Sequence, residues 1–291
     1  MLIEMAIQPK RPQDIGRLLE LLSGTAPDGA RFGVKTDPES GQTILLGDSE
    51  EALEALIKSV EDLGEIEFDV GAPQAAYREI LQTPVTVTHT YRRQIGGGGE
   101  FASVTIRFEP LPRGFGFVFE NKSFPLQVSD NFGPAVERAI ETRRHRGPLA
   151  GFPLSDFKVT LLDCRYHELD SNEFTFGIAA RGAFDELAKK GALRLIEPIM
   201  RAEVVTPDDF LGSVIGDLKS RRGRVQSIWE DGHKQTVNAL VPLANMFGYI
   251  NTLRAISQGS AQYQMKFSHY EPVSLPEDDD PNFSPAIGMR A

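Results

Sequence analysis

The stretch QTILLGDSEEALEALIKSVEDLGEIEFDV (residues 42–70) decides the fold of the first part of the chain. Its central apolar residues recur at helical spacing and predict one buried face: Leu53, Leu56, Ile57, Val60 and Leu63. Ser49 stands where a helix N-cap belongs, and two glutamates follow it at the positive end of the helix dipole. The apolar segments 42–47 and 65–70 on either side are expected to be strands.

The residues before this stretch complete the unit. LIEMAIQP (2–9) alternates apolar and polar residues as a half-buried strand does, and a helix is expected between Pro12 and Gly24. RFGVKT (31–36) is a further strand, joined to residues 42–47 by the turn DPESG (37–41). The resulting order, βαββαβ, predicts a ferredoxin-like sheet over residues 1–76.

The same order recurs over residues 196–272. After the strand LIEPIMRAEVV (195–205), Thr206 and Pro207 are placed to begin a helix and Gly223 to end it. A hairpin is expected around Asp231-Gly232, then a helix from Pro242 and a strand over 261–270.

The residues between these two units, 77–195, have a different order. Strands are expected over 86–91, 103–108, 115–120 and 157–163, and helices over 134–146 and 171–190. Residues 273–291 have no period and contain an acidic run, which predicts a solvated tail. We therefore expect an α+β protein with domains 1–76, 77–195 and 196–272, followed by the acidic tail 273–291.

Composition limits the possible functions. The chain has 31 Lys and Arg against 41 Asp and Glu, a net charge of −10, and its single cysteine, Cys164, excludes an internal disulfide. Residues 1–76 alone hold fifteen acidic against six basic residues, whereas residues 77–272 are slightly basic. No apolar run is long enough for a membrane span, and the N-terminus has no secretory pattern, so we expect a cytoplasmic chain without a membrane partner. We also expect a monomer that does not bind DNA.

The sequence contains no recognisable catalytic or metal-binding pattern. No phosphate-binding G-x-x-x-x-G-K-[ST] motif occurs, and no two of the five histidines lie three to five residues apart. We expect no catalytic residue, no metal and no cofactor in this chain.

Two loops are candidate binding sites, and so are three basic clusters: Arg92-Arg93, Arg143-Arg144-His145-Arg146 and Arg221-Arg222-Gly223-Arg224. Four glycines, Gly96 to Gly99, form a predicted hairpin tip, and four ordered glycines exceed what a turn needs. The loop CRYHELD (164–170) offers Tyr166 and His167, which suit RNA contacts. The cluster Arg221-Arg222-Gly223-Arg224 suits phosphate. Each has a structural alternative: a flexible loop, loop packing, or a helix C-terminus that favours arginine.

Several segments, in order along the chain, resemble the last three domains of translation elongation factor G, the ribosomal translocase. The matching segments include RRQIGGGGEFASV (92–104), EPLPRGFGFVFENK (109–122), LAGFPLSDFKVTLLDCRYHELDSNEF (149–174) and VIGDLKSRRGRV (214–225). The resemblance implies that 1–76, 77–195 and 196–272 are the family's third, fourth and fifth domains. It implies ferredoxin-like folds for the outer two and, for the fourth, a ribosomal-protein-like fold with a left-handed βαβ crossover.

The resemblance also implies an RNA-binding role. The fourth domain's tip enters the decoding centre of the ribosomal A site, where it meets ribosomal, messenger and transfer RNA. The matching tip residues are Gly96, Gly97, Gly98, Gly99, Glu100, Tyr166, His167, Asp170 and Ser171. In the fifth domain, which faces large-subunit RNA, the matching residues are Ser220, Arg221, Arg222 and Arg224. Full-length members bind GTP and Mg²⁺ in a domain that has no match in this sequence.

The sequence departs from the family pattern at several positions, which indicates a divergent paralogue, or the C-terminal part of one, rather than the housekeeping factor. Glu100 replaces a glutamine, Gly98 replaces a frequent arginine, residues 47–53 differ from the family's G-E-L-H-L-E, and residues 123–128 differ from its V-G-G-x-I-P. Three hypotheses follow: the ribosome-binding part of a translation factor, a GTP-independent ribosome-binding regulator or relic, and a small-molecule enzyme on ferredoxin-like modules.

Overall fold

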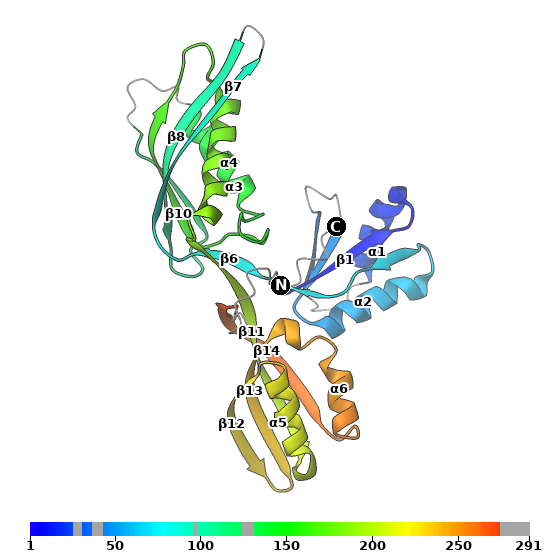
Figure 1. The fold of residues 1–291 in the computed structure, drawn as a ribbon. Coiled ribbons are helices and arrows are strands. Elements are labelled where there is room, and N and C mark those ends of the chain that lie inside the picture. The colour runs from blue at the N-terminus through cyan, green and yellow to red at the C-terminus, as the bar shows by residue number, and fades with distance from the viewer. Residues whose placement is uncertain (26–30, 37–42, 96–97, 124–130, 274–291) are drawn as a thin grey trace. The chain divides into compact units, whose positions relative to one another are not determined.

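The computed structural model describes residues 1–25, 31–36, 43–95, 98–123 and 131–273 (Figure 1). The predicted turn 37–41, the tip residues Gly96 and Gly97, most of the altered segment 123–128 and the tail after residue 273 lie outside the described residues. By backbone packing the chain divides into two units: Met1–Ala76 with Glu197–Glu271, and a second built around Tyr77–Ile196. The predicted four-part domain division stays a prediction.

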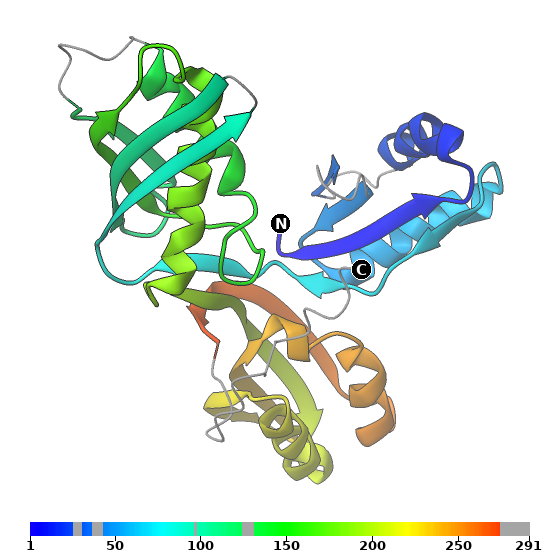
Figure 2. The ribbon, with the colours of Figure 1, turned by 45° about the horizontal axis from the view of Figure 1, so that its top comes forward.

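Residues 1–76 form the first predicted ferredoxin-like sheet. The elements are β1 (Ile3–Pro9), η1 (Pro12–Asp14), α1 (Ile15–Gly24), β2 (Phe32–Thr36), β3 (Thr43–Gly47), α2 (Glu50–Leu63), β4 (Phe68–Val70) and β5 (Gln74–Ala75). The strand order is β2-β3-β1-β4 with antiparallel neighbours, and β5 adds to β1. In Figure 2, α2 lies along the sheet behind β1. This order confirms the βαββαβ prediction.

The helix that decides this fold begins as predicted and ends slightly differently. The Ser49 side chain accepts a hydrogen bond from the backbone N–H of Ala52. Leu53, Leu56, Ile57 and Val60 are buried, but the prediction that Leu63 is buried is wrong, because it is the last helical residue and lies exposed.

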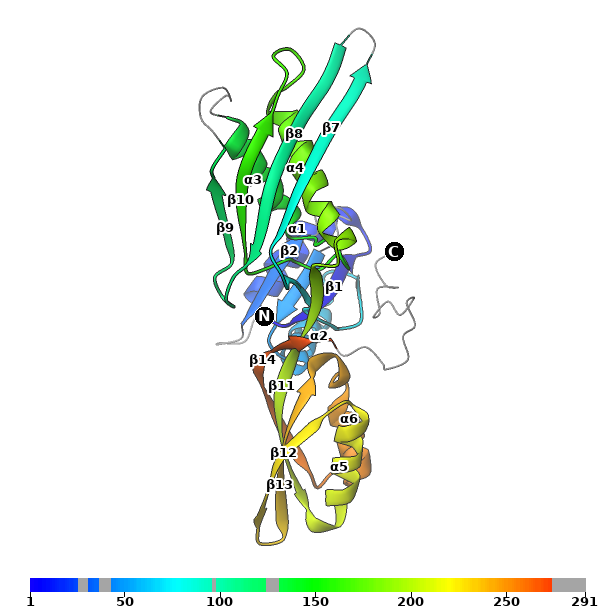
Figure 3. The same cartoon turned by 60° about the vertical axis from the view of Figure 1, so that its left-hand side comes forward.

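The same topology recurs in the second predicted ferredoxin-like sheet. Its elements are β11 (Leu193–Pro207), η2 (Asp208–Phe210), α5 (Leu211–Ser220), β12 (Arg224–Asp231), β13 (Lys234–Pro242), η3 (Leu243–Asn245), α6 (Tyr249–Ile256) and β14 (Gln262–Pro272). The order is β12-β13-β11-β14, and α5 and α6 cover one face (Figure 3).

Three predicted helix boundaries in this part are wrong. Thr206 is buried at the end of β11, and the helix after it begins without a side-chain cap. Pro242 ends β13, so that α6 begins only at Tyr249. α5 ends at Ser220, where Arg222, and not Gly223, has a left-handed φ of 64°. Gly223 is needed for a different reason, because a Cβ there would lie 2.4 Å from the Leu218 carbonyl oxygen.

The described part of residues 77–196 contains a third sheet of four strands, together with two helices and the separate strand β6. The elements are β6 (Arg78–Leu81), β7 (Val85–Ile95), β8 (Gly98–Pro110), β9 (Phe117–Asn121), α3 (Phe132–Arg143), β10 (Phe157–Arg165) and α4 (Glu173–Lys189). The order is β7-β8-β10-β9, while β6 pairs with β11. β9 and β10 are parallel and joined through α3, as the predicted βαβ unit requires. The hand of this crossover stays a prediction.

The two helices α3 and α4 cover one face of this sheet (Figure 3). The core between helices and sheet includes Val104, Ile106, Val159, Phe176 and Phe184, all fully buried. We call the other face of β7-β8-β10-β9 the open face. In the part of the chain that the structure describes, no helix is long and apolar enough to cross a membrane.

A buried carboxylate organises the loop between α3 and β10. Glu79, in β6, has no exposed surface, and its oxygens accept hydrogen bonds from the backbone N–H groups of Leu149 (3.0 Å), Ala150 (2.7 Å) and Phe152 (3.2 Å). Burial raises the pKa of Glu79, and these hydrogen bonds oppose the rise because they favour the charged form. Gly147 packs against this carboxylate so closely that no side chain fits there.

Replacing Glu79 by glutamine should loosen this loop. One oxygen becomes an NH₂ group that faces a backbone N–H, and an unsatisfied buried donor costs about 1–3 kcal/mol. We expect faster amide hydrogen exchange over residues 147–152 in Glu79→Gln than in the control Glu141→Gln, whose ion pair with Arg144 is long (3.9 Å). Equal exchange in both variants would contradict this role of Glu79.

Candidate nucleic-acid interface

The two predicted loops come together at one end of the third sheet. β7 and β8 pair up to Ile95 and Gly98, next to the undescribed residues 96–97. The loop after β10 is tied to β8 by two hydrogen bonds, from the Phe101 N–H to the Asp170 carbonyl (2.9 Å) and from the Ser171 hydroxyl to the Phe101 carbonyl (2.6 Å). We call residues 92–94, 98–101 and 166–171 the tip.

The second tip loop is also closed upon itself and anchored at its end. The His167 N–H donates to the Ser171 hydroxyl oxygen at 2.8 Å. Directly after Ser171, Asn172 and Thr175 form a reciprocal capping box at the start of α4. The loop is therefore held between β8 and a capped helix.

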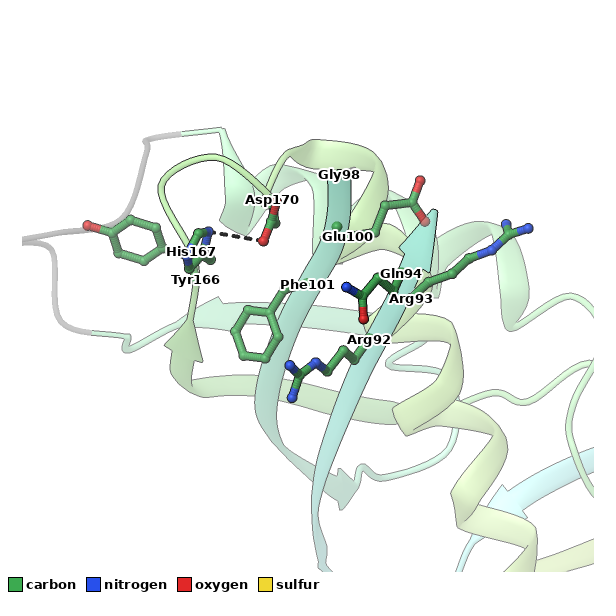
Figure 4. A pocket seen from close by; sticks show the side chains of 10 residues that line it. Arg92, Arg93, Gln94, Gly98, Glu100, Phe101, Tyr166, His167 and Asp170 are labelled. Carbon is green, nitrogen blue, oxygen red and sulfur yellow. Dashed lines mark ion pairs between the residues drawn. The ribbon is translucent and has the colours of Figure 1, made fainter. Parts of the chain in front are cut away.

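The tip surrounds a cleft of about 580 Å³. Side chains from both hairpin strands and from the second loop line it, as Figure 4 shows: Arg92, Gln94, Phe101, Tyr166, His167 and Asp170. The His167 Nδ1 lies 3.1 Å from the Asp170 carboxylate, so that the imidazole is oriented while remaining exposed. A Cβ on Gly99 would lie 3.0 Å from the same carboxylate, which explains a glycine at this position.

Tyr166 is only partly available to a ligand. Its ring lies 6.4 Å from the ring of Phe132, which in turn stacks on Phe176 at 4.3 Å. Tyr166 thus joins the second loop to α3 and α4 as well as lining the cleft. Leu169, at the far end of the loop, is 90% exposed.

Glu100 also lines the cleft, and its side chain lies on the Tyr91 side of the hairpin. Its carboxylate accepts a hydrogen bond of 2.6 Å from the Tyr91 hydroxyl, and Tyr91 packs against the core on the side that α4 covers. This hydrogen bond raises the pKa of Tyr91. The negative charge that replaces the family's glutamine is therefore held on the helix side of the hairpin.

The predicted arginine cluster has a different environment. Arg221 donates to Asp217 (2.8 Å), to the Asn245 carbonyl (2.7 Å) and to Thr252 (2.9 Å), and its guanidinium lies over the Tyr249 ring. Ser220 donates to the Asp217 carbonyl. Arg221 therefore holds the end of α5 against Asn245, Tyr249 and Thr252, whereas the Ser220 bond lies within α5. The contact of both residues with RNA stays a prediction.

Arg222 and Arg224 also have acidic partners. Arg222 binds Glu197 at 2.6 Å, and Glu197 is only 2% exposed. Arg224 binds Glu271 at 2.6 Å and lowers the pKa of that carboxyl. The arginine cluster therefore stabilises its own domain.

Sequence reasoning did not include Gln94, Phe101 or Arg165 among the candidate residues. It noted Arg92 and Arg93 as a basic pair that suits phosphate, but did not place Arg92 among the tip residues. The place of Arg92 opposite Phe101 follows from the register of β7 and β8, which composition alone does not reveal.

Other candidate residues have structural roles. His89 pairs with Glu186 at 2.7 Å between β7 and α4. Burial raises the pKa of Cys164 to about 11, which keeps its thiol protonated near neutral pH. Among the described residues, no group of histidine, cysteine and acidic side chains is arranged to hold a metal ion.

Comparison with known proteins places this geometry in a family. Residues 73–192 match the family model "Elongation factor G, domain IV", and residues 194–280 match "Elongation factor G C-terminus". The chain belongs to the elongation factor G family. The tip lies within the domain IV match, and the arginine cluster lies within the C-terminal match.

A solved structure supports the same relationship over more of the chain. It is a crystal structure of a protein from Thermus thermophilus, with 31% sequence identity and a TM-score of 0.66. The similarity covers 93% of this chain and 40% of that chain, so this elongation factor G-family chain spans less than half the length of the Thermus protein.

Arg222 should matter for stability. Arg222→Ala leaves the buried Glu197 carboxylate without its partner, and we expect a loss of about 1–3 kcal/mol in the free energy of unfolding. Arg224→Ala breaks a more exposed pair and should cost at most about 1 kcal/mol. Denaturant unfolding of the full chain measures both. If Arg224→Ala is as destabilising as Arg222→Ala, the burial argument is wrong.

Proposed function

We propose that this chain is the ribosome-binding part of an elongation factor G-like translation factor, and that its tip contacts decoding-centre RNA in the A site. Membership of the family supports a role in translation. The observation on which the assignment of the tip rests is that two loops about 70 residues apart are tied together by Phe101, Asp170 and Ser171 into one surface. Such a rigid surface suits contact with a folded RNA.

The charge distribution supports RNA as the partner despite the acidic composition. Arg92, Arg93, Arg165 and His167 gather at or beside the tip, while Glu100 is engaged by Tyr91. Local basic groups, rather than net charge, determine whether a phosphate backbone can approach. Phosphate contacts of this kind release counterions, so binding should weaken as salt rises.

The remaining parts of the function are proposals of the same kind. In the whole protein, GTP hydrolysis would be performed by a segment outside this chain and would drive movement of messenger and transfer RNA. A cytoplasmic location, a monomeric state and the lack of catalytic activity in this chain stay predictions.

Equilibrium binding to purified ribosomes over a salt series tests the proposal. We expect the logarithm of affinity to fall linearly with the logarithm of salt concentration, and Arg92→Ala to weaken binding and to reduce the slope by about one. His167→Ala should weaken binding with less effect on the slope. The matched control is Arg113→Ala, an exposed arginine in the loop after the opposite end of β8.

The result that would overturn the proposal is equally clear. If the chain does not bind ribosomes at low salt, it is not a ribosome-binding module by itself. If Arg92→Ala and Arg113→Ala reduce affinity equally, the tip is not the contact surface. Arg222→Ala is unsuitable for this test, because its loss of Glu197 pairing changes stability as well as charge.

A further inference from the structure

We infer that the open face of the tip holds one unpaired nucleotide of RNA, with its base stacked on Phe101 and its phosphate against Arg92. This inference rests on the proposed function and deepens it, because it names the chemical group that the tip recognises. The surface consists of Arg92, Gln94, Phe101, Arg165 and His167, and we call it the Phe101 face.

The alternation of β8 places Phe101 on the open face. Ala102, Val104 and Ile106 are fully buried beneath the helices, so the residues between them point the other way. Side-chain hydroxyl groups of β7 and β8 meet on this open face, Thr90 with Ser103 at 2.9 Å and Thr88 with Thr105 at 3.0 Å, which confirms the direction of the row that contains Ser103 and Thr105. Phe101 is the next residue of this row towards the tip.

Both strands next to β8 carry an arginine near Phe101. Arg92 of β7 is directly opposite Phe101 in the antiparallel register, and Arg165 of β10 is opposite Ser103 on the other side of β8. Arg165 is 78% exposed and only loosely associated with Asp163, at 3.7 Å. Among the described residues, no carboxylate forms an ion pair with Arg92, so its charge is available to a ligand.

The Phe101 ring is also without an aromatic partner among the described residues, although eight other ring pairs occur there. Figure 4 shows the ring on the same side of the hairpin as the Arg92 side chain, facing the cleft. An aromatic ring flanked by arginines is the arrangement by which proteins stack an unpaired base and hold its phosphate.

The other groups around the ring provide hydrogen bonds. The Gln94 amide can donate and accept, and the exposed His167 imidazole is held in place by Asp170. These groups suit the edge of a base or a ribose hydroxyl. The cleft of about 580 Å³ lies within the range of about 300–1,000 Å³ that is usual for small-ligand sites.

The position of Glu100 determines which side of the hairpin faces RNA. Tyr91 and Glu100 point to the helix side and are joined by a hydrogen bond of 2.6 Å. The side with Phe101 therefore has arginines and a partly exposed ring, while the Glu100 carboxylate on the opposite side is held by Tyr91. We therefore expect the phosphate on the Phe101 face, where the Asp170 carboxylate is paired with His167 and Arg92 has no ion pair among the described residues.

Fluorescence of a base analogue tests stacking directly. The full chain is titrated into a short single-stranded RNA that contains one fluorescent purine analogue, and we expect quenching that saturates with binding. Base stacking on an aromatic side chain is worth about 1–3 kcal/mol, so Phe101→Leu should weaken binding about 5- to 150-fold and remove most of the quenching. Phe101→Tyr should keep both.

The control and the contradicting outcomes separate this inference from the proposed function. Phe115→Leu removes a ring that is 65% exposed in the loop after the far end of β8 and should leave binding and quenching unchanged. If the RNA is not bound by the full chain, or if Phe101→Leu binds and quenches like the unaltered chain, the inference is wrong. Ribosome binding that persists in that case leaves the proposed function intact. Quenching without ribosome binding refutes the proposed function alone.

Discussion

The arrangement of the tip depends on the hydrogen bonds of one short strand segment with the loop after β10. Phe101 donates its N–H to Asp170 and accepts from the Ser171 hydroxyl, and that hydroxyl oxygen also accepts from the His167 N–H. Ser171 is thus both donor and acceptor, and it fixes His167 relative to β8. Because Asn172 caps α4 immediately afterwards, the loop is held from both ends. The Phe101 ring, the Arg92 guanidinium and the His167 imidazole consequently share one surface.

Hydrogen bonds and ion pairs within the protein determine which charged side chains remain free to bind RNA. Glu79 accepts hydrogen bonds from backbone N–H groups, Glu197 pairs with Arg222, and Asp217 pairs with Arg221. A buried carboxylate without such partners would be costly, so these groups are committed to the fold. At the tip the balance is different: Tyr91 engages Glu100, and on the other side of the hairpin Arg92 has no ion pair with a carboxylate among the described residues. A charge count of the sequence does not distinguish these cases.

Local sequence patterns predicted the fold well where the spacing and chemistry of neighbouring residues alone determine a helix, a cap or a turn. The period of α2, the Ser49 cap and the Asp231-Gly232 turn follow from spacing and side-chain chemistry, and together they predict both ferredoxin-like orders. The errors arose where tertiary contacts prevail. Thr206 is buried in a strand instead of capping a helix. Arg222 adopts the left-handed φ at the end of α5, where the Gly223 N–H donates to the Leu218 carbonyl, and its side chain pairs with Glu197. The predicted tip loops do meet, yet the face that Phe101 and Arg92 share depends on strand register, which no local pattern specifies.

The most direct test of a tip that contacts RNA is photo-crosslinking from position 169 in ribosome complexes. Leu169 is 90% exposed at the end of the second tip loop, so a photoreactive side chain there should preserve the fold. The account predicts crosslinks to small-subunit ribosomal RNA near the decoding centre, and no such crosslinks from the same group at the exposed Phe115 beyond the other end of β8. Bound chains that crosslink at position 169 only to protein, or equally from both positions to the same RNA, would contradict it.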